Sequence, residues 1–115
     1  MKDISIFFQP ILDVSSSFKK ESLGEFIEKH SEAGFPTIEK SSVALFYVPE
    51  YRNSSYSNKM KSDEFREKLY NLFLGANWKN PIYDLGTILP GNSIDDTYHA
   101  VSQVSKELIK QKCIP

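Results

Sequence analysis

The residues best suited to chemistry in this sequence lie in one polar loop, directly after the apolar run at 43–48. Glu50, Arg52 and Asn53 place a carboxylate, a guanidinium and an amide close together in this loop. An arginine can bind a substrate carboxylate through two parallel hydrogen bonds. We therefore take these three residues as candidate substrate contacts. An ordinary solvated loop is the alternative interpretation.

A second loop, at 86–93, offers a different kind of site. It precedes a helix expected at 93–112, and backbone amides at the start of a helix can hold an anion. Its sequence, GTILPGNS, matches neither the dinucleotide-binding fingerprint nor the phosphate-binding P-loop. The alternative interpretation of the function depends on this loop. In that interpretation the chain is a complete small α/β binding or interaction module with an anion site at 86–93.

The remaining chemical groups indicate structural roles. Cys113 is the one cysteine and cannot form an internal disulfide, so we expect an inert thiol at the entry to a buried strand. His30 and His99 have no partner at metal-ligand spacing; we expect the first as a packing or surface residue and the second on a helix surface. Asp95 and Asp96 suit the positive end of a helix dipole. The sequence therefore names no catalytic residue and no metal ligand in this chain.

Composition excludes several classes of function. The chain has 115 residues, which leaves room for one domain. Lysine plus arginine (14) nearly balances aspartate plus glutamate (15), so no basic surface for nucleic acid or an acidic membrane is expected. The apolar run at 4–8 is too short for a signal peptide, and no run approaches the roughly 18–20 residues that span a bilayer. We expect a cytoplasmic protein.

The elements that must position these loops begin with a lead-in at 1–42. We expect it to be irregular and serine-rich, with one short helix that Ser22 caps and that Gly34 and Pro36 end. After it, the apolar run at 43–48 lacks polar alternation, which predicts a strand buried on both of its faces.

A second helix is expected to begin at Ser62 and to end near Gly75. Its expected buried stripe is Phe65, Leu69, Leu72 and Phe73. A second strand follows at 81–86. Asp84 lies near the end of this strand, where it can either serve a site or hydrogen-bond the adjoining loops.

The helix at 93–112 is the best defined, with Asn92 or Ser93 as its cap. Its expected buried stripe is Ile94, Tyr98, Val101, Val104, Leu108 and Ile109. Alternating strands and helices predict right-handed crossovers and a parallel sheet. A third strand should begin at Cys113, where the sequence stops. We therefore expect 43–115 to be the first βαβα units of a larger domain, whose sheet is incomplete here.

Four segments of this stretch form a recognisable pattern. They are VALFYVPEYRN at 43–53, FREKLYNL at 65–72, IYDLG at 82–86 and NSIDDTY at 92–98. In this order they resemble the ureohydrolases, the family of arginase, agmatinase and formimidoylglutamase. The first resembles the family's first core strand and loop, the second its helix with an Ile-Arg and a Leu-Tyr a few residues apart, and the third its second strand with an Asp-x-Gly. KCIP at 112–115 resembles the approach to the third strand. The amino-acid sequences of these segments are most similar to those of formimidoylglutamase-like members.

The resemblance implies a three-layer α/β/α fold around a parallel sheet, in a parent protein that forms a homo-oligomer. Members use two manganese ions to activate a hydroxide that attacks a guanidinium or formimino carbon. Their metal ligands come from Gly-Gly-x-His, Asp-x-His-x-Asp and Asp-x-Asp stretches, none of which occurs here. The implied function is that of the N-terminal segment of a manganese-dependent hydrolase, whose partner is the remainder of the parent polypeptide. The parent would take a small guanidino or formimino substrate, while this chain alone is expected to bind no metal and to catalyse nothing.

Overall fold

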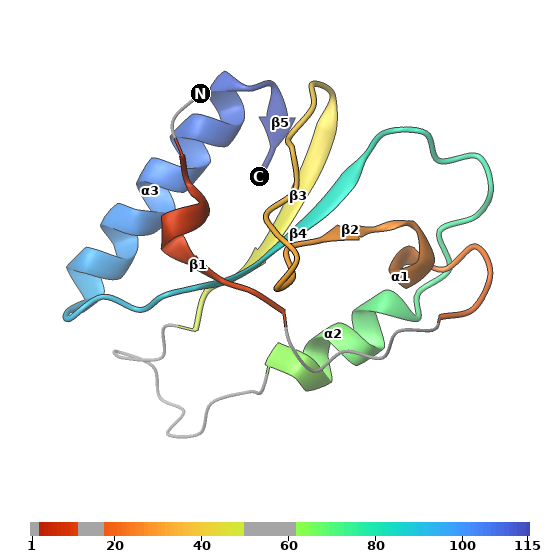
Figure 1. Cartoon of the computed structure of the whole chain (residues 1–115), viewed down its shortest axis with the longest axis horizontal. Coiled ribbons are helices and arrows are strands. Elements are labelled where there is room, and N and C mark those ends of the chain that lie inside the picture. Colours follow the sequence, from red (N-terminus) through yellow and green to blue (C-terminus); the bar gives the residue numbers. More distant parts are fainter. Residues whose placement is uncertain (1–2, 12–17, 50–61) are drawn as a thin grey trace.

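Parallel strands form the centre of a five-stranded sheet, and helices lie on both faces of that sheet (Figure 1). The computed structural model describes residues 3–11, 18–49 and 62–115. Within these ranges the chain is a mixed α/β domain with five strands and three α-helices. The expected α/β class is confirmed, although one strand runs antiparallel to its neighbour.

The centre of the sheet has the spatial order β4-β3-β5. These strands are β3 (Ser42–Tyr47), β4 (Ile82–Ile88) and β5 (Cys113–Ile114). Val43 of β3 lies opposite Ile82 on one side and opposite Ile114 on the other, and both pairings are parallel. All three strands that the sequence predicted are thus confirmed, with bounds that differ by at most two residues.

Two further strands come from the lead-in and pair with the outer edge of β4. β1 (Phe8–Gln9) runs antiparallel to the end of β4, and β2 (Glu28–Lys29) runs parallel to its beginning. The amide of Ile11 donates to the carbonyl of His30 at 2.9 Å and so connects the two segments. The expectation of an irregular lead-in is wrong here, because the edge of β4 offers N–H and C=O groups that need partners.

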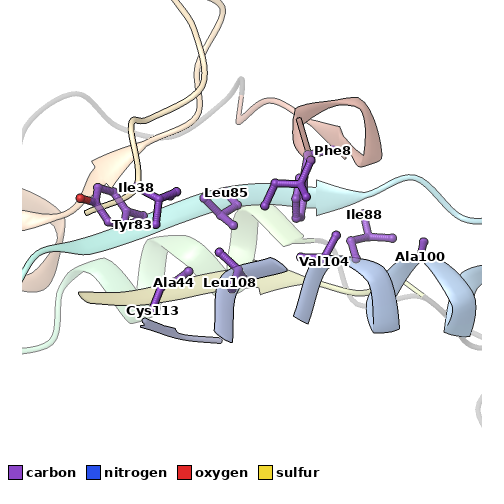
Figure 2. Packing of buried hydrophobic residues seen from close by; sticks show 11 residues of the cluster. Phe8, Ile38, Ala44, Tyr83, Leu85, Ile88, Ala100, Val104, Leu108 and Cys113 are labelled. Carbon is purple, nitrogen blue, oxygen red and sulfur yellow. The ribbon is translucent and has the colours of Figure 1, made fainter. Parts of the chain in front are cut away.

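One face of the sheet is covered by α3 (Ile94–Lys110). Ser93 caps this helix as expected, since its hydroxyl accepts a hydrogen bond from the Asp96 amide at 3.2 Å. Figure 2 shows Val104 and Leu108 among the buried side chains that α3 shares with the sheet. These two residues belong to the predicted stripe and are fully buried.

The rest of the α3 stripe differs from the prediction. Tyr98 and Ile109 are exposed, whereas Thr97 and Ala100 are buried. The buried face of the helix therefore combines Thr97 and Ala100 near its start with Val104, Glu107 and Leu108 further along. The Thr97 hydroxyl is buried because it accepts a hydrogen bond from the Gly91 amide at 2.9 Å.

The opposite face carries α1 (Leu23–Phe26) and α2 (Ser62–Tyr70), which pack against β4. Ser22 caps α1 as expected and accepts a hydrogen bond from the Glu25 amide at 3.4 Å. However, α1 ends well before the expected glycine, because the chain then pairs with β4 as β2. A tertiary strand pairing here overrides the local helical pattern.

Of the apolar stripe expected for α2, Leu69 is partly buried and packs against the core, but the other three members do not follow the prediction. Phe65 and Phe73 are 46% and 79% exposed, and Leu72 is exposed as well. Arg66 and Tyr70 face the sheet instead and are buried. The helix also ends at Tyr70, before the expected glycine.

β3 is less buried than its apolar sequence predicts. Ala44 is buried on the α3 face, but Val43, Leu45 and Tyr47 are only partly buried. The expectation of burial on both faces is therefore wrong for the face that carries α2. No helix within the described ranges is long and apolar enough to cross a membrane.

Candidate functional site

A buried ion pair joins α2 to β4. The Arg66 Nε donates to Asp84 Oδ2 at 2.8 Å, and Arg66 Nη2 donates to Asp84 Oδ1 at 3.2 Å. Arg66 is 4% exposed and Asp84 2% exposed. The two parallel hydrogen bonds form the bidentate arrangement that gives an arginine–carboxylate pair its geometric specificity.

Two more donors complete the surroundings of this carboxylate. The hydroxyl of Tyr70 donates to Asp84 Oδ2, and the amide of Gly86 donates to Asp84 Oδ1 at 3.0 Å. Burial raises the pKa of Tyr70, and the neighbouring charge of Asp84 raises it further. Tyr70 therefore stays protonated and serves as a hydrogen-bond donor, and the Asp84 carboxylate accepts four hydrogen bonds. Arg66, Tyr70, Asp84 and Gly86 are called the arginine–aspartate cluster below.

Local sequence explains how these residues come together. Arg66 and Tyr70 are four residues apart in α2, so they lie on the same face of the helix. Asp84 shares the α2 side of β4 with Ile82, because alternate residues of a strand point to the same face. Gly86 has a φ of +100°, and a Cβ there would overlap the carbonyl oxygen of Gln9. Only glycine allows both this backbone and the approach of β1.

Side chains from the lead-in cover the outside of the cluster. The Lys29 Nζ lies 5.2 Å from the centre of the Phe18 ring and 5.3 Å from that of the Tyr70 ring. These distances are typical of cation–π contacts.

His30 lies beside β4, where its Nδ1 donates to the Leu85 carbonyl at 2.9 Å. His30 is buried, which confirms a packing role for this histidine.

A cavity of about 220 Å³ lies next to the cluster, between α2 and the end of β3. Its walls are mostly apolar and come from Leu45, Phe46, Tyr47, Phe65 and Leu69. Arg66 and Asp84 also contribute to the lining. Because these two charges neutralise each other, the cavity offers an apolar space beside a balanced ion pair rather than a charged binding site.

The three residues predicted to contact substrate, Glu50, Arg52 and Asn53, lie outside the described residues. The structure does place the start of their loop, since β3 ends at Tyr47. Asp84 forms hydrogen bonds, as one of its two predicted roles required, but its partners lie in α2 and β4 rather than in the adjoining loops. The carboxylate holds an arginine, a tyrosine and a backbone amide.

The predictions for the polar residues at the start of the long helix are confirmed. Asp95 and Asp96 lie exposed in the first turn of α3, and His99 is exposed on its surface. The amide of Gly91 donates to the Thr97 hydroxyl at 2.9 Å, and the Asp96 amide donates to Ser93. The amide of Gly91, within the 86–93 loop, and that of Asp96, in the first turn of α3, are thus both engaged in hydrogen bonds.

Cys113 is buried in β5, and burial raises the pKa of its thiol, as expected for an inert cysteine. Among the residues that the structure describes, no group of three or more histidine, cysteine, aspartate or glutamate side chains could hold a metal ion.

The sequence patterns alone did not predict the burial of Arg66 and Tyr70. Their spacing of four residues, together with an aspartate in the next strand, is the signal that could have revealed it.

Comparison of the chain with protein families, with characterised proteins and with solved structures finds no significant match.

Proposed function

We propose that this sequence is the N-terminal segment of a manganese-dependent ureohydrolase-like C–N hydrolase of the formimidoylglutamase, arginase or agmatinase type. The observation that carries the proposal is the arginine–aspartate cluster. Two of the family-like segments, at 65–72 and 82–86, contribute Arg66 and Tyr70 on one side and Asp84 and Gly86 on the other. The residues that make these segments resemble the family are therefore partners in one structural unit.

The order of the central strands also supports the proposal. Numbered along the chain among themselves, the three central strands β3, β4 and β5 have the spatial order 2-1-3, and the two-residue strand β2 adds a further parallel neighbour to β4. This order begins one common type of doubly wound α/β sheet, in which ligands bind beyond the carboxyl ends of strands 1 and 3. The loop with Glu50, Arg52 and Asn53 follows strand 1 of this scheme. A substrate-binding role for this loop is consistent with that position.

The described residues do not fit a manganese pair. Asp84 has both oxygens engaged by Arg66, Tyr70 and Gly86. The remaining polypeptide of the parent would supply the metal ligands, so the segment alone neither binds manganese nor catalyses hydrolysis. Its own contribution is the rigid start of the sheet and a loop at the mouth of the pocket. The parent acts on a small guanidino or formimino compound in the cytoplasm, as a homo-oligomer.

Hydrolysis assays test this function. The complete product of the gene that encodes this sequence is purified, supplied with Mn²⁺ and offered formiminoglutamate, arginine and agmatine. The proposal expects manganese-dependent release of formamide or urea from one of them, and none from the 115-residue chain. Calorimetry of the 115-residue chain should show no tight manganese binding. A complete gene product that leaves all three compounds intact, or a tight two-manganese site on the 115-residue chain, would overturn the proposal.

A further inference from the structure

We draw no further inference here: the strongest candidate, the apolar cavity between α2 and the end of β3, belongs to a partly exposed apolar face of the sheet, and nothing in the residues that the structure describes shows what covers that face.

Discussion

Arg66 Nε lies 2.8 Å from Asp84 Oδ2, and this contact fixes α2 against β4. The pair links a helix and a strand that are 18 positions apart in the sequence. Asp84 also holds the Gly86 amide, so the same carboxylate orders the glycine bend in β4. The buried Asp84 carboxylate thus connects α2 with β4. It also affects the position of β1, because Gln9 of β1 lies against Gly86.

Removal of the arginine should leave a buried carboxylate without its counter-charge. We expect Arg66→Met to lower the free energy of unfolding by about 3–5 kcal/mol, measured by urea denaturation. The double variant Arg66→Met with Asp84→Leu should recover much of this loss, because it removes both charges together. A loss below about 1 kcal/mol for Arg66→Met would contradict the role given to this ion pair.

Tyr70 should make stability depend on alkaline pH. Its pKa is raised in the folded state above the value of about 10 in an unfolded chain, so the folded state retains the proton longer. This contribution is fully present below pH 10 and is lost as the pH rises above it. Tyr70→Phe should reduce the slope of unfolding free energy against pH in that range. Because burial also raises the pKa values of Tyr83 and Cys113, the informative quantity is the difference between variant and wild type.

The same substitution also removes a hydrogen bond to a buried carboxylate. At neutral pH, Tyr70→Phe should cost about 1.5–3 kcal/mol in urea denaturation. An unchanged alkaline slope, combined with a neutral-pH cost near zero, would show that the Tyr70 hydroxyl does not hold Asp84.

Substitution by alanine should destabilise the fold far more at Gly86 than at Gly34, which is a second glycine with positive φ. Gly86 has a φ of +100° and no room for a Cβ beside Gln9, whereas Gly34 has a φ of +146° and open space around it. Gly34→Ala should lower the free energy of unfolding by about 1–3 kcal/mol, because only the backbone conformation is strained. Gly86→Ala strains the backbone and also displaces β1, so its unfolding midpoint in urea should fall further. Equal midpoints would mean that the contact of Gln9 with Gly86 has no energetic importance.

Cys113 should react slowly in the folded chain. The thiol is 2% exposed, and burial raises its pKa, so little reactive thiolate is present at neutral pH. We expect iodoacetamide to modify it at least about tenfold more slowly than in concentrated urea. A rate that equals that of the unfolded chain would show that β5 opens freely from β3.

Arg52 provides a test of the loop after β3. In the complete gene product, Arg52→Ala should raise KM for a carboxylate-bearing substrate and change kcat less, because the arginine would bind the carboxylate rather than act on the reacting carbon. Arg66 is no suitable control, since it stabilises the fold. Lys68, exposed on α2, is the better one, and Lys68→Ala should leave KM unchanged. An unaltered KM in Arg52→Ala would remove this residue from the substrate site.

Much of the central fold was predictable because it depends on local patterns. The apolar run at 43–48 and the segment at 81–86 gave the two main strands, and Ser93 gave the start of α3. The third strand at Cys113 followed from the alternation of strands and helices. These features depend on short-range periodicity and capping, which the sequence displays directly.

The remaining features depend on partners far away in the chain. β1 and β2 are two residues each, too short to show a period, and they exist because β4 has an edge to pair with. The side of α2 that faces the sheet is the one that carries Arg66, and Phe65 is exposed as a result. This orientation depends on Asp84, which lies in another element. A hydrophobicity pattern treats a buried arginine as a surface residue, so it predicted the contact of Leu69 with the core but missed the burial of Arg66.

The reading frame beyond the codon for Pro115 tests the central claim most directly. If this sequence begins a ureohydrolase-like hydrolase, sequencing of the transcript will show an open frame that continues into a Gly-Gly-x-His-like stretch shortly after β5 and into the later aspartate-rich stretches. A stop codon directly after Pro115 would contradict the claim and favour a complete small α/β module.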